Sequence, residues 1–217
     1  MPPICLTFDN GPEPDVTPGV LDVLARRRLA ATFFVVGEKL RAPAGRALAE
    51  RARAEGHRLG NHTLTHGAPL GRRSATEAVQ EISETDALLG ALHGPDRLFR
   101  PNGGGGALGP HLLNAAARQY LEAHGHTVVL WNAVPGDFRE PEAWPDIAHA
   151  MIAKAAEPVL LVLHDLPNGA MRHLDRFLGQ LIDAGAVFVQ KPPEACVPLS
   201  RGVARDDLAR YVTEETA

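Results

Sequence analysis

Two short segments of the chain carry side chains that could bind a metal and activate water. The first holds Asp9 and Asn10, a carboxylate next to a carboxamide, between an apolar run and Gly11-Pro12. The second holds His62 and His66, two imidazoles four residues apart. If that segment turns helically, the spacing places both rings on one face, which suits two nitrogen ligands to one metal. Together the two segments could supply a general base and up to three metal ligands.

Each of these residues also has an ordinary structural explanation. An Asp shortly before Gly is common turn or capping chemistry. The chain has ten histidines, so a spacing of four arises easily by chance. Catalytic zinc typically keeps three protein ligands and an open position for water, whose pKa it lowers. Either Asp9 or Asn10 could complete such a set with His62 and His66, and an Asp9 that is not a ligand is a candidate general base.

Further polar side chains follow apolar runs later in the chain. Arg100 could orient Asp9 through a charge-assisted hydrogen bond, or it could form a buried structural ion pair. His164 could be a general acid held in the correct tautomer by Asp137, or a hydrogen-bonded residue that closes a strand. Asp165 follows His164 directly. Ionisable residues scattered at random would not fall so regularly after apolar runs, which favours an enzyme.

Short apolar runs alternate with helical patterns along the whole chain. Strands are predicted at residues 4–8, 32–36, 57–60, 98–101, 127–131, 159–163 and 186–189. Helices are predicted at residues 17–28, 42–55, 74–92, 110–124, 144–156 and 171–184, with a short one at 206–212. Fully apolar strands alternating with helices indicate a parallel sheet covered by helices. Seven such units favour a closed or nearly closed α/β barrel, whose active site lies at the C-terminal ends of the strands.

Composition limits the remaining possibilities. The 217 residues are 45% hydrophobic and 22% charged, and we expect one domain over 1–217, with a less patterned extension from about residue 192. The net charge of −4 and the lack of a long basic run argue against nucleic-acid or acidic-membrane binding. Cys5 and Cys196 form no disulfide framework. No apolar stretch is long enough to span a membrane, and no secretory leader is visible, so we expect a cytoplasmic protein unless an export signal lies outside this sequence.

Five segments resemble, in order, the motifs of the NodB-homology polysaccharide deacetylases, a family of metal-dependent carbohydrate de-N-acetylases and de-O-acetylases. The resemblance runs from about residue 4 to 189. The segments and the family motifs that they resemble are 7–12 with Thr-Phe-Asp-Asp-Gly-Pro, 62–66 with His-(Ser/Thr)-x-x-His, 100–104 with Arg-Pro-Pro-aromatic-Gly, 134–138 with Asp-x-x-Asp-Trp and 161–165 with Leu-x-Leu-His-Asp. The third segment agrees only in its Arg, first Pro and last Gly, and the fourth only in one Asp.

The resemblance implies a distorted, seven-stranded parallel (β/α) barrel and a role for each matched residue. Asp9 would be the base that activates a metal-bound water, and Arg100 would tether it. His164 would protonate the leaving amine, tuned by Asp137. A backbone N–H near Gly103 would join the metal in stabilising the oxyanion. The implied substrate is a carbohydrate that contains N-acetylglucosamine, as an oligomer or a polymer.

The departures from the family pattern concern the metal and the groove. Asn10 stands where the family usually has an Asp ligand, and its neutral carboxamide oxygen is a poorer partner for zinc. We therefore expect a divalent metal, zinc foremost, held by His62, His66 and Asn10 more weakly than is usual in the family. Asn102-Gly103 replaces Pro-aromatic and Phe138 replaces Trp. Both changes alter surface that usually packs against the acetyl group or the sugar.

These observations leave three hypotheses. The leading one is a metal-dependent hydrolase that removes acetyl groups from N-acetylated or O-acetylated carbohydrate. The second is a deformylase or another small amide or ester hydrolase on the same scaffold, motivated by the altered third and fourth motifs. The third is a carbohydrate-binding pseudoenzyme that lost its metal through Asn10. Against the third, the candidate base, tether, tuning residue and acid are all present, as Asp9, Arg100, Asp137 and His164.

Overall fold

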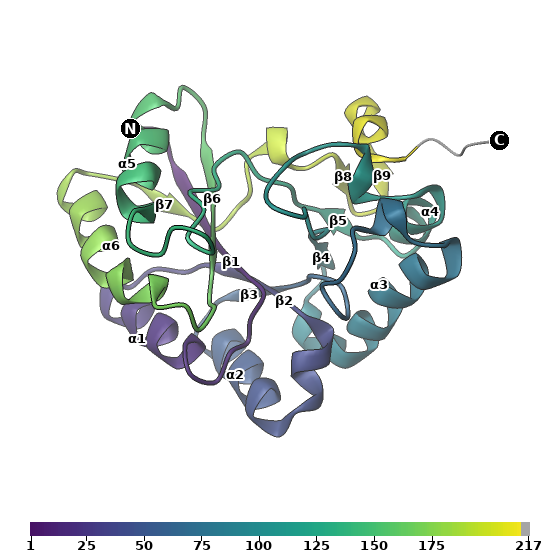
Figure 1. The fold of residues 1–217 in the computed structure, drawn as a ribbon, viewed down its shortest axis with the longest axis horizontal. Coiled ribbons are helices and arrows are strands. Elements are labelled where there is room, and N and C mark those ends of the chain that lie inside the picture. The colour runs from purple at the N-terminus through teal and green to yellow at the C-terminus, as the bar shows by residue number, and fades with distance from the viewer. Residues whose placement is uncertain (214–217) are drawn as a thin grey trace.

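Seven parallel strands form a curved sheet at the centre of the computed structural model, which describes residues 1–213 (Figure 1). They run in the order β6-β1-β2-β3-β4-β5, with β7 paired to β1. Their bounds are β1 Ile4–Asp9, β2 Thr32–Val35, β3 Arg58–Asn61, β4 Leu98–Phe99, β5 Thr127–Val128, β6 Val159–His164 and β7 Phe188–Val189. All seven predicted strands are present and parallel.

Two strands were not predicted. The segment from about residue 192, expected to be an unpatterned extension, contributes β8 (Leu199–Ser200) and β9 (Val203–Ala204). Both are antiparallel and continue the sheet beyond β5, so the sheet has nine strands rather than seven. Strands of two residues are too short to produce a recognisable alternation of apolar and polar residues.

Helices surround the sheet on its outer side (Figure 1). They are α1 Thr17–Arg27, α2 Pro43–Ala54, α3 Ala75–Leu89, α4 Ala115–Ala123, α5 Trp144–Lys154 and α6 Leu174–Asp183. A capping box starts α3, with Ser74 and Glu77 satisfying each other's backbone N–H groups. None of the helices in residues 1–213 has the length and apolar character needed to cross a bilayer.

Three predicted helices differ in detail. The helix expected at 110–124 is a 3₁₀ turn followed by α4, because the side chain of Asn114 accepts the N–H of Ala117 and starts a new helix there. The helix expected at 171–184 begins as the 3₁₀ turn Ala170–His173 before α6. The segment expected at 206–212 is a 3₁₀ helix over Asp206–Tyr211.

The chain after β5 closes the sheet into a distorted barrel. The predicted strand over 127–131 ends at Val128, because the following residues leave β4 and cross to β6. Ala133 then pairs with β6 in parallel, donating to the carbonyl of Leu160 at 3.2 Å and accepting from the N–H of Val162 at 2.9 Å. This short bridge, to Leu161 in the middle of β6, joins the two sides of the barrel.

Side chains of β1 alternate between two environments, and this alternation places Asp9 inside the barrel. Leu6 and Phe8 belong to the core between the sheet and the helices, together with most of the buried residues of α1 and α6. Thr7 and Asp9 point the other way, into the barrel, as the two-residue period of a strand requires. The register pairs Asp9 with His164 at the end of β6, so two candidate catalytic residues are neighbours on adjacent strands.

Candidate active site

The residues singled out in the sequence meet in one cleft at the C-terminal ends of the strands. The cleft has a volume of about 480 Å³. Arg100 and Asp137 stand directly behind its wall, both fully buried and each hydrogen-bonded to a residue that lines it. The polar and glycine residues of the lining are Asp9, Asn10, His62, His66, Gly67, Asn102, Gly103, Gly104, Gly105, Gly106 and His164.

Asp9 is held by Arg100 in a fully buried ion pair. Arg100 Nη1 lies 2.7 Å from Asp9 Oδ1 and also donates to Thr7 Oγ1 at 2.8 Å. Its Nε and Nη2 donate to the carbonyl oxygens of Val129 and Leu130, at 3.1 and 3.3 Å. The guanidinium is therefore fixed from several directions, and it fixes the orientation of the Asp9 carboxylate in turn.

This ion pair also sets the basicity of Asp9. Burial, the largest single influence, would raise the pKa of the carboxyl group, but the charge and hydrogen bond of Arg100, together with His62 and His164, outweigh burial and hold the pKa below its usual range. Asp9 is therefore ionised at neutral pH and is a weak base. A weak base takes a proton readily only from water that has itself been made more acidic, as it is beside a metal ion.

His62 and His66 present neutral rings to the cleft. Nδ1 of His62 lies 2.8 Å from the carbonyl oxygen of Arg100. A carbonyl only accepts, so Nδ1 carries the proton and Nε2, 3.6 Å from Asp9 Oδ2, presents its lone pair. Burial lowers the pKa of His62 to about 3 and also lowers the pKa of His66. The two ring centroids are 4.9 Å apart. Neutral imidazoles with a free nitrogen are what a metal ligand requires.

The path of this histidine segment differs from expectation. It is not helical: Thr63 and His66 have positive φ angles of 68° and 51°, and the chain bends between them. Glu81 of α3 imposes the bend, because its buried carboxylate accepts the N–H groups of Leu64 and Thr65, both at 2.9 Å. The rings still meet, but through a loop anchored on a neighbouring helix rather than through a helical turn. Glu81 was not singled out in the sequence, and no local signal identifies it.

The side-chain oxygen of Asn10 is available to bind a metal ion. This oxygen is buried and has no hydrogen-bond partner among residues 1–213. A buried acceptor without a partner is unfavourable unless a bound group satisfies it. Within the same residues, no three His, Cys, Asp or Glu side chains are grouped to hold a metal. A metal in the cleft would thus need the carboxamide of Asn10 beside His62 and His66, and these three donors fit a divalent cation while adding no charge.

His164 is held by Asp137. Its Nδ1 lies 2.9 Å from Asp137 Oδ1, and its backbone N–H donates to Asp137 Oδ2 at 2.7 Å. Burial works against protonation of the ring, but the hydrogen bond and the charge of Asp137 outweigh it and raise the pKa of His164. The ring of Phe138 packs edge-on against His164, with centroids 4.9 Å apart. His164 is therefore oriented by Asp137, and its protonated form is favoured, as a proton donor requires.

The glycine segment after β4 passes directly over Trp131, a residue that was not singled out in the sequence. The indole N–H donates to the carbonyl of Gly106 at 2.8 Å. A Cβ atom at Gly103 would lie 2.7 Å from the indole ring, so a side chain there would collide. The N–H of Gly103 has no acceptor among the described residues. It is available to a bound oxygen, and its role in an oxyanion hole stays a prediction.

Asp165 packs against Gly11 of the first motif. It is fully buried, accepts a short hydrogen bond from the Thr17 hydroxyl, and has a pKa raised to about 7 by burial. Its carboxylate lies 2.2 Å from where a Cβ of Gly11 would stand, so only glycine fits beside it. The sequence placed Asp165 after His164 without a role, and the structure gives it one in shaping the turn that carries Asn10.

Comparison with known proteins agrees with this geometry. The family model described as polysaccharide deacetylase matches residues 1–129. The peptidoglycan-N-acetylglucosamine deacetylase PgdA of Listeria monocytogenes is 31% identical over 188 residues, which are 86% of this chain and only 37% of that protein. A chitooligosaccharide deacetylase of Sinorhizobium fredii is 34% identical over 166 residues, which are 76% of this chain and 72% of that protein.

Solved structures give the same result. A family 4 carbohydrate esterase from Streptomyces lividans, in complex with acetate, has a TM-score of 0.72 at 25% identity and covers 90% of this chain and 96% of its own. The peptidoglycan deacetylase PdaC of Bacillus subtilis has a TM-score of 0.69 at 28% identity, covering 87% and 88%. The expected distorted α/β barrel and the expected family are both confirmed. The chain belongs to the polysaccharide deacetylase family.

Proposed function

We propose that this chain is a metal-dependent hydrolase that removes acetyl groups from N-acetylated carbohydrate. The observation that carries the proposal is that the pKa values of Asp9 and His164, which are neighbours in one cleft, are shifted in opposite directions. Arg100 holds the pKa of Asp9 low, while Asp137 raises the pKa of His164. A pair of titratable groups whose environments push their pKa values apart is the arrangement of a base and an acid that act on the same bond.

In this mechanism Asp9 accepts the proton of the attacking water, and Arg100 keeps its carboxylate ionised and oriented. A divalent metal, zinc foremost, held by His62, His66 and Asn10, would polarise the acyl carbonyl and make the water more acidic. The free N–H of Gly103 donates to the carbonyl oxygen as negative charge develops on it.

His164 completes the reaction by giving a proton to the leaving nitrogen. Because Nδ1 is hydrogen-bonded to Asp137, Nε2 is the atom that transfers the proton. The carboxylate of Asp137 stabilises the imidazolium before transfer and fixes the tautomer after it. Without this proton an amine anion would have to leave, and the amide bond would not break at a useful rate.

N-acetylglucosamine units are the substrate that we propose. Relatives named for peptidoglycan N-acetylglucosamine and for chitooligosaccharides support this class. The cleft, at about 480 Å³, is within the usual range for a small-molecule site. Its lining also offers apolar surface for an acetyl methyl group, from Trp131, Val134, Phe138, Val162 and Leu166.

A deformylase or another small amide or ester hydrolase is the second candidate. One observation favours it: Asn102, which replaces Pro, donates to the carbonyl of Gly67 at 2.6 Å and leaves its own Oδ1 without a partner among residues 1–213. This adds a polar acceptor to the cleft wall. The pseudoenzyme hypothesis has less support, because the buried Asp9–Arg100 and His164–Asp137 pairs are both formed.

The experiment measures acetate release from a chito-oligosaccharide by protein supplied with zinc, with parallel arms for formylated and acetylated small amides. We expect acetate release that a chelator abolishes and added metal restores. Asp9→Asn and His164→Gln should lower the rate by at least about a hundredfold. Asp22→Asn, on an exposed ion pair with Arg51, is the matched control and should leave the rate unchanged. Full activity of metal-free protein would overturn the mechanism, and a preference for formylated amides would favour the second candidate.

A further inference from the structure

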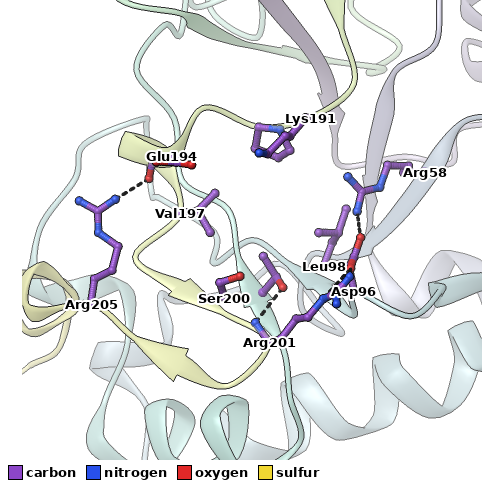
Figure 2. Close-up of a pocket in the computed structure, with 11 residues that line it drawn as sticks. Arg58, Asp96, Leu98, Lys191, Glu194, Val197, Ser200, Arg201 and Arg205 are labelled. Carbon is purple, nitrogen blue, oxygen red and sulfur yellow. Dashed lines mark hydrogen bonds and ion pairs between the residues drawn. The ribbon is translucent and has the colours of Figure 1, made fainter.

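A second and larger pocket lies at the other end of the barrel (Figure 2). Its volume is about 600 Å³. Arg58, Leu98 and Thr127, the first residues of β3, β4 and β5, form one side, and the segment 191–205 forms the other. Because the active-site cleft lies at the C-terminal ends of the same strands, the two sites are at opposite ends of the barrel. The proposed hydrolysis uses none of these residues.

The pocket concentrates positive charge on a chain that is negative overall. Four cationic side chains and two carboxylates line it, and Asp207 next to the pocket pairs with Arg205 at 3.2 Å, which leaves an excess of one positive charge on a chain of net charge −4. The lining side chains are Arg58, Lys191, Arg201 and Arg205 against Asp96 and Glu194. A concave surface on which positive charge predominates focuses the electrostatic potential and raises the local concentration of anions.

Two of the arginines are fixed in place by one acid. Asp96 accepts from Arg58 Nη2 through one oxygen and from Arg201 Nε, at 3.0 Å, through the other (Figure 2). The backbone N–H of Arg201 is also held, by Thr127 Oγ1 at 3.1 Å. Both guanidiniums therefore stand in the pocket wall before any ligand arrives, and each keeps an Nη1 group without an acceptor in residues 1–213. A planar guanidinium with free N–H groups suits phosphate or carboxylate oxygens.

Lys191 and an apolar floor complete the pocket. Lys191 stands across the open space from Arg58 and has no ion-pair partner in the part of the chain that the structure describes (Figure 2). Its charge is therefore not neutralised locally. Leu98, Val197 and Pro192 supply the apolar lining between the charged groups. Cations above an apolar floor match a ligand with one oxyanion on a compact body.

We propose that this pocket binds a small molecule that carries a phosphate or carboxylate group on a body of sugar size. Lys191 and the free N–H groups of Arg58 and Arg201 contact the oxyanion. Leu98 and Val197 contact the body. A volume of about 600 Å³ accommodates one such ligand.

The test is calorimetric titration of this chain at low ionic strength. The protein is metal-free, so that a phosphate cannot bind a metal in the other cleft. Glucose 6-phosphate, glucuronate and glucose are the three probes. We expect saturable binding of one or both charged sugars, weakened by added salt, and none of glucose. The charged sugar that binds more tightly identifies the preferred oxyanion. The double variant Lys191→Gln, Arg201→Gln should weaken binding at least about tenfold, because two charged contacts are lost.

Arg41→Gln is the matched control, because Arg41 is also an exposed arginine in an ion pair, with Glu84. It removes one positive charge, half the change made by the double variant, from a surface outside the pocket and should leave affinity unchanged. Circular dichroism of each variant checks that the fold is intact. The proposal is overturned if neither charged sugar binds, if glucose binds equally well, or if Arg41→Gln weakens binding as much as the double variant. None of these results depends on whether the chain is a deacetylase.

Discussion

Replacing Asn10 with Asp should change two properties of the protein in opposite directions. The substitution adds a carboxylate where a buried amide oxygen now has no partner among residues 1–213. Without a metal, this charge stands beside Asp9, whose positive partner Arg100 is already engaged by several acceptors. With a metal, the same charge becomes a ligand. We therefore expect Asn10→Asp to lower the stability of the metal-free protein and to raise its affinity for zinc.

The sizes follow from elementary electrostatics. Two like charges about 4 Å apart repel by about 4 kcal/mol at an effective dielectric constant of about 20. At pH 7 the new carboxyl group can instead take up a proton, which limits the cost to about 4 kcal/mol. The pKa of an ordinary Asp lies roughly three units below pH 7, and each unit is worth about 1.4 kcal/mol. A divalent ion would gain about 8 kcal/mol from the new charge on the same scale. The cost of placing the charge beside Asp9 is present with and without metal and does not change the affinity, whereas desolvation of the carboxylate and loss of the amide ligand reduce the gain to a few kcal/mol, about 4 kcal/mol at most. Metal affinity should therefore rise between about tenfold and about a thousandfold, and metal-free stability should fall by about 2–4 kcal/mol.

Calorimetric zinc titration and urea unfolding of the metal-free protein measure the two effects. Asn102→Asp is the matched control, because Asn102 lines the same cleft and its side-chain oxygen also lacks a partner in the described part of the chain. It adds the same charge at a position that is not expected to bind the metal. The reasoning is refuted if zinc affinity is unchanged in Asn10→Asp, or if both variants gain affinity equally, since the gain would then come from net charge and not from coordination.

Three further predictions concern protons and packing. Asp137→Asn removes the charge that raises the pKa of His164, so the alkaline limb of the pH–rate profile should move to lower pH; an unmoved limb would exclude His164 as the acid. Gly103→Ala should lower the rate of acetate release at least about tenfold, because the new methyl group collides with Trp131, and an unchanged rate would contradict the contact. Burial lowers the pKa of His62 to about 3 in the folded chain, against about 6.5 in the unfolded chain, so between these values the unfolded chain binds more protons. The stability of the metal-free protein should therefore rise as pH rises from about 3 to about 6.5 and fall as pH falls, with His62 contributing about 1.4 kcal/mol per unit; His62→Gln should remove this contribution in urea unfolding, and an identical slope would refute the assignment.

The positions of the main catalytic candidates were predictable from the sequence, because they depend only on strand periodicity and strand direction. Asp9 and His164 end apolar runs, and parallel strands bring their C-terminal ends to one edge. Arg100 follows β4 directly and reaches the same edge. No long-range information is needed for these three.

The rest depends on contacts that are distant in sequence. The bend of the histidine segment is imposed by Glu81 in a helix, and nothing near Leu64 or Thr65 encodes that anchor. Strand β5 is shorter than its apolar run because Ala133 pairs with β6 instead. Trp131 resembles an ordinary core residue in the sequence, and only the folded chain brings it under the glycine segment. In each case tertiary pairing overrides a local pattern.

The neutral ligand set at Asn10 and the weak base at Asp9 are consistent with each other. A cation held by two imidazoles and an amide keeps more of its positive charge than one held by a carboxylate, and a more positive cation acidifies water more strongly. Asp9 needs such acidified water, because Arg100 keeps its pKa low. In the proposed site, weaker retention of the metal and stronger activation of water would thus both follow from an Asn at position 10. On this reasoning Asn10→Asp tightens zinc binding without a proportional gain in the rate of the zinc-saturated enzyme.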